Sequence, residues 1–454
     1  MSKSPPNVLV VMVDQQSASM MSCAGNRDLH TPYMDSIAAR GVRFDRAYCT
    51  NPLCIPSRFS LLTGRRPSEI GLWSNRTSHL PPLAAQFEGR ALGHLLQQAG
   101  YLTAYAGKVH LPRMKAEDIG FEVISADERE AMAEDCAAFL QRRHNQPFCL
   151  FASFINPHDI CMMALCDFAT TDHEKLLVDI CRTEQKTLDV VLQRPEDVDE
   201  GTFISQYCPP LPPNYEPQED EPEAIRLMLE ARPFRAAARE RWNASRWREH
   251  RWAYARLTEK VDSEIGIVLE SLRASPYADN TVVIFTSDHG ELDAAYRMEH
   301  KSTHYEPACR IPLIIDAPGV ANPGAVAQEL VSNGLDLMPT ICDYAGAAVP
   351  PELSGRSLRP LVEGREIGEW RTALPLENAC GRAIVTQNFK YFQADIGQSA
   401  EQLYDRQTDP WEKRNALQDP ALAAELSDLR HLHKQLFQTP VRDEATVLAD
   451  LESS

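Results

Sequence analysis

Residues 51–66, which read Asn-Pro-Leu-Cys-Ile-Pro-Ser-Arg-Phe-Ser-Leu-Leu-Thr-Gly-Arg-Arg, place a nucleophile beside fixed positive charge. Pro56 suits the first turn of a helix, because proline lacks the N–H that an internal turn would need. Cys54 would then lie at the positive end of that helix, where an anion is stabilised, and Arg58 would add a cation one turn later. The spacing predicts an activated thiol, and a buried structural cysteine ahead of an ordinary helix is the alternative.

Four more polar side chains follow two apolar runs that are typical of buried strands. Residues 7–13 lead into Asp14 and Gln15, and residues 281–287 lead into Asp288 and His289. Such runs favour a mainly parallel sheet covered on both faces, and ligands bind at the carboxyl ends of its strands. Two carboxylates, an amide oxygen and an imidazole around one open position suit Ca²⁺, Mg²⁺ or Mn²⁺. We therefore expect a divalent-metal site, although Asp14 by itself could equally cap its strand.

Basic and imidazole side chains follow two other apolar runs. Lys108 and His110 come after residues 102–106, and His158 comes after residues 148–155. If these runs are strands of the same sheet, their polar ends lie at the edge where the expected metal ligands lie. Lys108 could instead pair with a carboxylate only, and His110 could be a buried histidine with satisfied hydrogen bonds.

The string Cys54-x-Pro-Ser-Arg58, followed by Leu62-Thr-Gly-Arg65, resembles the signature of type I sulfatases, which belong to the alkaline phosphatase superfamily. In that family a formylglycine-generating enzyme oxidises the cysteine to formylglycine, whose hydrated aldehyde is the nucleophile. The resemblance implies this modification at position 54. It also implies a cradle for one divalent ion, with Ca²⁺ favoured over Mn²⁺ and Mg²⁺. Its ligands would be Asp14, Gln15, Cys54, Asp288 and His289.

Further segments extend the resemblance over most of the chain. Gly-Lys108-x-His110 resembles the sulfatase lysine-histidine pair, and Asn-Pro-His158-Asp resembles the stretch with the family's third-strand histidine. Lys301, followed by residues 305–313, resembles the segment that carries a second lysine, and residues 402–415 resemble the family's C-terminal subdomain.

These matches imply a role for each side chain. Arg58 and Lys108 would stabilise the aldehyde hydrate and its oxyanion. His158 and Lys301 would protonate the departing alcohol, and His110 would take the proton from the second hydroxyl so that sulfate is expelled.

Two sites in the chain depart from the commoner sulfatase pattern. Many sulfatases carry Asp-Asp where this chain has Asp-Gln at 14–15, and Asp-Asn where it has Asp-His at 288–289. The Gln and His variant also occurs in phosphonate monoester hydrolases, so the metal site alone does not decide the substrate. Lys108 and His110 favour a sulfatase, because the phosphonate enzymes have uncharged residues at these two places.

We therefore expect a sulfuric ester hydrolase that acts on a small sulfate monoester, and a phosphonate monoester or phosphodiester hydrolase is the alternative. Local strings around Cys54 and Lys108 are similar to choline sulfatases, but no aromatic cluster can be assigned to a quaternary ammonium group. A non-enzymatic metal-binding relative would have lost some of the site residues. None of them is missing from this chain.

The pattern of elements predicts an α/β fold with a mainly parallel central sheet sandwiched by helices. An apolar stripe at spacings of three and four residues indicates a long helix; it comprises Leu257, Val261, Ile265, Val268 and Leu272. We expect a catalytic domain at 1–365, in which the insertion 160–250 forms a wall on the substrate side. A C-terminal subdomain at 366–454 should contain a small antiparallel sheet and a helix over 421–437.

Composition limits the partners of the protein. Its 46 basic and 64 acidic residues give a net charge of −18, which argues against nucleic acid or an anionic membrane as the main partner.

No stretch approaches the ~20 apolar residues of a membrane span, and no apolar signal segment precedes residue 7. None of the twelve cysteines forms a Cys-x-x-Cys pair. We expect a cytoplasmic protein with reduced thiols; its oligomeric state, including a homo-oligomer, stays open.

Overall fold

The computed structural model describes residues 5–452 and is built around an eight-stranded sheet. Five consecutive strands, β5, β4, β6, β1 and β7, are parallel to one another, whereas β8 runs antiparallel to β7. In spatial order the strands are β5 (Glu122–Ser125), β4 (Leu102–Gly107), β6 (Phe148–Pro157), β1 (Asn7–Asp14), β7 (Thr281–Ser287), β8 (Leu313–Asp316), β2 (Val42–Phe44) and β9 (Ala325–Ala327).

Strand β1 lies at the centre of this sheet and is buried on both faces. Side chains of Val8 and Val10 join one apolar core, whereas Leu9 and Val11 join the other, because successive side chains of a strand point to opposite faces. The parallel registers pair β1 with β6 on one side and with β7 on the other. Residues that follow these three strands are therefore brought together at one edge of the sheet.

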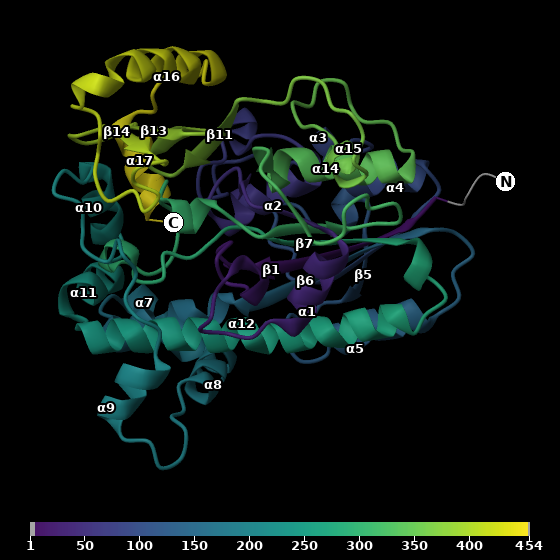
Figure 1. The fold of residues 1–454 in the computed structure, drawn as a ribbon, viewed down its shortest axis with the longest axis horizontal. Helices are drawn as coiled ribbons and strands as arrows, with labels where there is room; N and C mark the ends of the chain where they lie inside the picture. Colours follow the sequence, from purple (N-terminus) through teal and green to yellow (C-terminus); the bar gives the residue numbers. More distant parts are fainter. Residues whose placement is uncertain (1–4, 453–454) are drawn as a thin grey trace.

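Helices cover both faces of the sheet (Figure 1). On one face lie α2 (Cys54–Thr63), α4 (Leu92–Gln98) and α14 (Asn333–Ala345), and on the other lie α1 (Pro32–Arg40), α5 (Met132–Gln141) and α12 (Ala244–Arg273). All five residues of the predicted stripe on α12 are buried: Val261, Ile265, Val268 and Leu272 in the second core, and Leu257 in the neighbouring cluster around Trp247. The predicted α/β sandwich is confirmed.

Residues 42–48 are divided between two sheets in the structure. Residues 42–48 form β2 in the central sheet and the two-residue strand β3 (Ala47–Tyr48), which pairs with β10 (Val331–Ser332) in a separate sheet. Between them the Asp45 carboxylate pairs with Arg43 two residues earlier and with Arg310. This polar turn changes the direction of the chain. The apolar residues continue from β2 into β3, but the two strands pair with different neighbours.

Residues 160–250 form short helices that lead directly into α12. They are α6 (Met162–Phe168), α7 (Asp172–Ile180), α8 (Arg182–Val191), α9 (Glu200–Thr202), α10 (Glu223–Glu230) and α11 (Pro233–Arg241). Trp247 is fully buried, and its ring meets Trp242 edge to face at 4.7 Å. Aromatic packing therefore stabilises the start of α12.

The C-terminal part contains a four-stranded antiparallel sheet and a covering helix, as expected. The strands are β11 (Ala373–Asn378), β12 (Gly381–Thr386), β13 (Phe389–Ala394) and β14 (Glu401–Asp405), followed by α16 (Ala423–Leu436) and α17 (Glu444–Leu451). Leu426 and Leu429 of α16 join an apolar cluster with Ile384 and Tyr391 of the sheet. The remaining short helices are α3 (Ala84–Phe87), α13 (Glu306–Cys309) and α15 (Arg359–Val362).

Within residues 5–452, no helix combines the length and the apolar character needed to cross a bilayer.

Candidate active site

Cys54 is the first residue of α2, and its sulfur lies among polar groups from three separate strand ends and loops. The Sγ atom is 3.2 Å from Nε2 of His289 and 3.2 Å from Nζ of Lys301. Lys108 Nζ lies 3.8 Å away. Pro56 lies in the first turn, as predicted, and Gly64 ends the helix with φ of 68°. All of α2 is buried, so the thiol lies at a helix N-terminus that is shielded from bulk water.

Arg58 joins the two carboxylates at the ends of β1 and β7. Its Nη2 is 2.8 Å from Oδ2 of Asp14, and its Nε is 2.9 Å from Oδ2 of Asp288. Its Nη1 donates to the backbone oxygen of Lys108 at 2.7 Å and to Ser153 Oγ at 2.9 Å. A fully buried guanidinium that is hydrogen-bonded in this way fixes three strand ends relative to one another. The structure shows no hydrogen bond from Arg58 to Cys54.

Lys108 and Lys301 bring two ammonium groups to the same place. Lys108 Nζ is 2.7 Å from Oδ2 of Asp14, so the lysine pairs with a carboxylate while it lies near the thiol. Lys301 Nζ donates to Gln15 Oε1 at 2.6 Å and to Cys54. The loop after β7 thus supplies a second cation to the nucleophile.

The imidazole of His289 is oriented by the backbone. Its Nδ1 is 3.0 Å from the carbonyl oxygen of Gly290, and a carbonyl can only accept, so Nδ1 carries a proton. In the neutral ring, Nε2 then presents its lone pair toward Cys54 and the carboxylates. This tautomer is the one that a metal-binding histidine with a hydrogen-bonded Nδ1 adopts.

The donor set fits a divalent ion. Ligand atoms of Asp14, Cys54, Asp288 and His289 all lie within 4.8 Å of one another, and all four side chains are buried. No other group of His, Cys, Asp and Glu in residues 5–452 is found at such spacing. Two carboxylates with one imidazole match the expected preference for Ca²⁺, Mn²⁺ or Mg²⁺. Gln15 Oε1 lies beside this group, in contact with Lys301.

Electrostatics favour an anion at position 54. Burial and Asp14 would raise the pKa of the Cys54 thiol, but Lys108 and Lys301 outweigh both and hold this pKa well below its usual range. Burial would also raise the pKa of Asp14, yet the charge of Lys108, with other cations, holds it well below the usual value. Burial and Asp14 raise the pKa of Asp288. The site is therefore organised to hold negative charge at residue 54.

The two predicted histidines differ in their surroundings. His158 begins a short 3₁₀ turn (His158–Cys161) after β6 and is half-buried. Burial, followed by the charges of Lys301 and Lys108, lowers its pKa to about 4, so that the ring is neutral near pH 7. His110 is exposed, has φ of 47°, and makes no hydrogen bond within the described part of the chain. Only His158 is brought into the cluster.

Two residues that the sequence reasoning did not single out contact Gln15. Glu291 accepts a hydrogen bond from Gln15 Nε2, and Cys161 Sγ lies 3.0 Å from the same nitrogen. Glu291 stands three residues after Asp288, in the string Asp-His-Gly-Glu. Its place directly after a predicted strand end was a signal that could have marked it.

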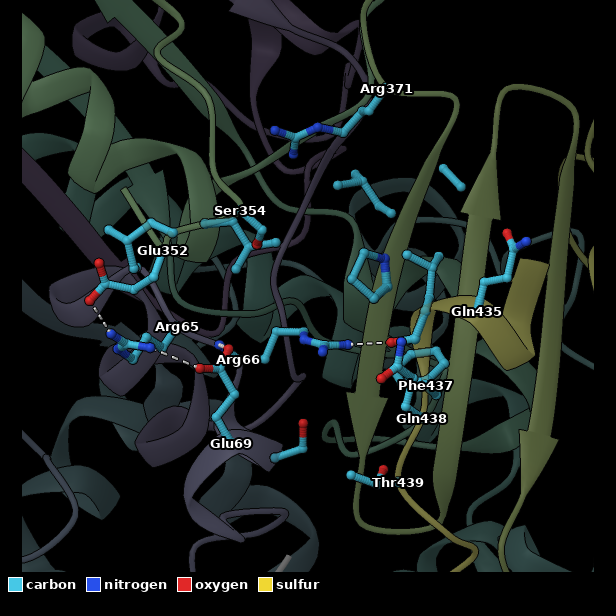
Figure 2. A pocket seen from close by; sticks show the side chains of 18 of the residues that line it. Arg65, Arg66, Glu69, Glu352, Ser354, Arg371, Gln435, Phe437, Gln438 and Thr439 are labelled. Atoms are coloured by element: carbon cyan, nitrogen blue, oxygen red, sulfur yellow. Dashed lines mark hydrogen bonds and ion pairs between the residues drawn. The ribbon is translucent and has the colours of Figure 1, made fainter. Parts of the chain in front are cut away.

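A separate cavity of about 680 Å³ lies at the opposite end of α2, between residues 64–66 and the segment 435–439 that continues from α16 (Figure 2). None of the predicted site residues lines it. Arg65 is paired with Glu69 and Glu352, and Arg371 with Asp336. This cavity is distinct from the Cys54 cluster.

Comparison with known proteins agrees with this geometry. The Sulfatase family matches residues 6–347, and the family described as N-sulphoglucosamine sulphohydrolase, C-terminal, matches residues 295–441. The chain is 28% identical to Delta 4,5-hexuronate-2-O-sulfatase of Bacteroides thetaiotaomicron over 94% of this chain and 88% of that protein. It is 27% identical to choline-sulfatase of Rhizobium meliloti, over 98% and 90% of the two chains.

Solved structures share the fold. A 2-O GAG sulfatase superposes with a TM-score of 0.81 at 24% identity, covering 99% of this chain and 98% of that one. Phosphonate monoester hydrolase of Agrobacterium radiobacter superposes with a TM-score of 0.70 at 21% identity, covering 94% and 96%. The fold is therefore the one that sulfatases and these phosphonate hydrolases have in common. The family match over residues 6–347 shows that this chain belongs to the Sulfatase family and is a sulfatase enzyme.

Proposed function

We propose that this enzyme hydrolyses a small sulfate monoester with residue 54 as its nucleophile, after a formylglycine-generating enzyme has oxidised Cys54 to formylglycine. The observation that carries the proposal is the position of Cys54 Sγ, at the N-terminus of a buried helix and 3.2 Å from both Lys301 and His289. An oxygen nucleophile on the same Cβ would lie in the same field of positive charge.

One divalent ion, for which Ca²⁺ is our first choice ahead of Mn²⁺ and Mg²⁺, completes the proposal. Asp14, Gln15, Asp288 and His289 would hold it, together with an oxygen on residue 54. When bound, the ion would neutralise charge on the sulfate group. The buried carboxylates, which already lie close together, support this assignment.

The hydrated aldehyde gives residue 54 two oxygens with different tasks. One oxygen forms a bond to sulfur while the bond from sulfur to the alcohol oxygen breaks, and the alcohol leaves with a proton. The second hydroxyl then loses its proton, the aldehyde re-forms, and the bond from Cβ to the sulfate oxygen breaks. Water adds to the aldehyde and restores the diol. We assign removal of that proton to His110 on the resemblance of its Gly-Lys-x-His string alone, because its exposed side chain lies outside the Cys54 cluster in this structure.

Lys301 is the group that carries a proton toward the leaving alcohol in this proposal. Burial would lower its pKa, but Cys54, Cys161 and Asp14 outweigh burial and raise the pKa above its usual range. His158 is neutral in the substrate-free protein, so it gains a proton only when the anionic substrate offsets the two lysines. Arg58 and Lys108 act on the nucleophile side. Arg58 holds the carboxylates of Asp14 and Asp288 in place, whereas Lys108 places its positive charge near residue 54.

The insertion 160–250 would form the substrate-side wall. Arg129 supports this role, because its Nη1 pairs with Asp159 at 2.6 Å and its Nη2 with Glu184 of α8 at 2.9 Å. This bridge ties the insertion to the residue next to His158. The names of the relatives include both sulfated sugars and choline sulfate, so they support a sulfate monoester without selecting the alcohol.

Two measurements test the proposal. Hydrolysis of an aryl sulfate should exceed that of a phenyl phosphonate ester in kcat/KM, and Cys54→Ala should abolish both. The mass of the peptide containing residue 54, isolated from protein made together with the maturing enzyme, should show the aldehyde. A tenfold preference for the phosphonate, equal to about 1.4 kcal/mol in transition-state binding, would establish the phosphonate alternative instead.

A further inference from the structure

Glu291 is a fully buried carboxylate whose two oxygens contact different parts of the site. Its Oε2 accepts a hydrogen bond from Nε2 of Gln15. Its Oε1 accepts from the backbone N–H of His300 at 2.5 Å and from that of Asp293 at 3.2 Å. His300 directly precedes Lys301 in the chain. One side chain therefore links the end of β1 to the loop that delivers the second lysine.

We infer that Glu291 is a positioning residue, which turns the oxygen of the Gln15 amide toward the metal cradle and its nitrogen away. This inference rests on the proposed function, in which Gln15 is a ligand. A side-chain amide has an accepting end and a donating end, and only the oxygen can bind a cation. If the amide turned over, its NH₂ group would face the ion and the ligand would be lost.

The partners of the two ends determine the orientation of this amide. Lys301 Nζ, which can only donate, lies 2.6 Å from Oε1. Glu291 Oε2 accepts from Nε2, and its other oxygen accepts from two backbone N–H groups, so both oxygens of this carboxyl group act as acceptors. Cys161 Sγ lies 3.0 Å from Nε2 and 3.2 Å from Oε1, so it contacts both ends of the amide and does not select between them. With the ends exchanged, the amide NH₂ would face an ammonium group, and the amide oxygen would face a carboxylate.

Hydrogen bonds fix the backbone of Gln15, so Glu291 is needed only to set the orientation of the side-chain amide. Gln15 has φ of 72°, in the left-handed region that a glutamine seldom adopts. Its N–H donates to Asp288 Oδ1 at 3.1 Å, and its carbonyl accepts from the Tyr254 hydroxyl at 2.7 Å. An aspartate at position 15 would present two equivalent oxygens and would need no such partner. The requirement for Glu291 follows from the glutamine in this chain.

The test measures Ca²⁺ binding by calorimetry on the full-length, chelator-treated protein. Glu291→Met keeps the length of the side chain and removes the acceptor, and Glu291→Gln keeps an accepting oxygen. We expect the Kd for Ca²⁺ to rise by about 10–100-fold in Glu291→Met, the usual cost of losing a partner of a metal ligand, and by about threefold at most in Glu291→Gln. Glu377→Met is the matched control, because Glu377 is a buried carboxylate that bonds to Ser68 outside the site. Its Kd should equal that of the wild type.

A double-mutant cycle separates positioning from a general effect on the fold. In a Gln15→Ala background there is no amide to orient, so adding Glu291→Met should change the Kd by about twofold at most. Unchanged Ca²⁺ affinity in Glu291→Met, or an equal loss in the Gln15→Ala background, would overturn the inference and leave the proposed function standing. A wild-type protein that binds none of Ca²⁺, Mn²⁺ and Mg²⁺ would overturn the metal assignment itself, and this inference with it.

Discussion

The protonation state of His158 gives a direct test of the electrostatics at the leaving side. The structure lowers the pKa of His158 from its ordinary value of 6.5 to about 4, first through burial and then through the charges of Lys301 and Lys108. This difference corresponds to about 3 kcal/mol against the imidazolium form. Because the pKa is depressed, the folded protein binds this proton less readily than the unfolded chain. Its stability should therefore fall as the pH drops from about 6.5 toward about 4, and His158→Gln should remove that part of the acid sensitivity.

The titration can be followed by NMR on metal-free protein with ¹³C-labelled histidine. The resonance that disappears in His158→Gln belongs to His158, and the other histidines serve as internal controls. At pH 5 we expect about a tenth of His158 to be protonated, whereas an unperturbed histidine would be almost fully protonated. Added sulfate should move the midpoint upward, because a bound dianion offsets the two lysines. A midpoint above about 6 without sulfate would refute the reasoning, since His158 would then carry its own proton in the free enzyme.

Three other predictions concern the nucleophile, the metal and the base. Cys54→Ser should release at most one alcohol per active site and then carry a stable sulfate adduct, because serine lacks the second hydroxyl; sustained turnover without an adduct, checked by mass analysis of residues 51–58, would exclude the diol mechanism. Asp288→Ala should abolish turnover and bound metal while it lowers Tm only modestly, since the change removes a ligand and little packing; near-normal activity with unchanged metal content, measured by elemental analysis, would contradict the cradle. His110→Ala should leave Tm unchanged, because the side chain is exposed, and should accumulate the sulfated form of residue 54 seen by intact-mass analysis; turnover at the wild-type rate would remove His110 from the base role.

Most of the elements that carry the site could be predicted from local patterns. The apolar runs at residues 7–13, 148–155 and 281–287 are strands because each can be buried on both faces, and each ends at the polar residues expected. The helix after Cys54 and the stripe of α12 follow from proline placement and from periods of three and four residues. Each of these patterns is contained within a single strand or helix, so it can be recognised in the sequence without knowledge of the tertiary structure.

The division of residues 42–48 between two sheets could not be predicted in the same way. The apolar alternation is similar in β2 and β3, and only their partners, β8 and β9 for one and β10 for the other, distinguish them. Those partners are more than 250 residues away in the chain. A short strand's own residues specify a pleated, half-buried surface but not the neighbour that covers it.

The sequence by itself determined which chemical groups reach the site: the thiol of Cys54, the carboxylates of Asp14 and Asp288 and the ammonium groups of Lys108 and Lys301. Their types and their places after predicted strands required no knowledge of distances. Only the tertiary structure decided how these groups are paired and which histidine joins them. Contacts such as Arg58 with Asp288, or Gln15 with Glu291, span 230 and 276 positions of the chain. Their strength, and the pKa values they set, depend on separations of a few ångströms in a buried medium, which only the packed sheet and helices establish.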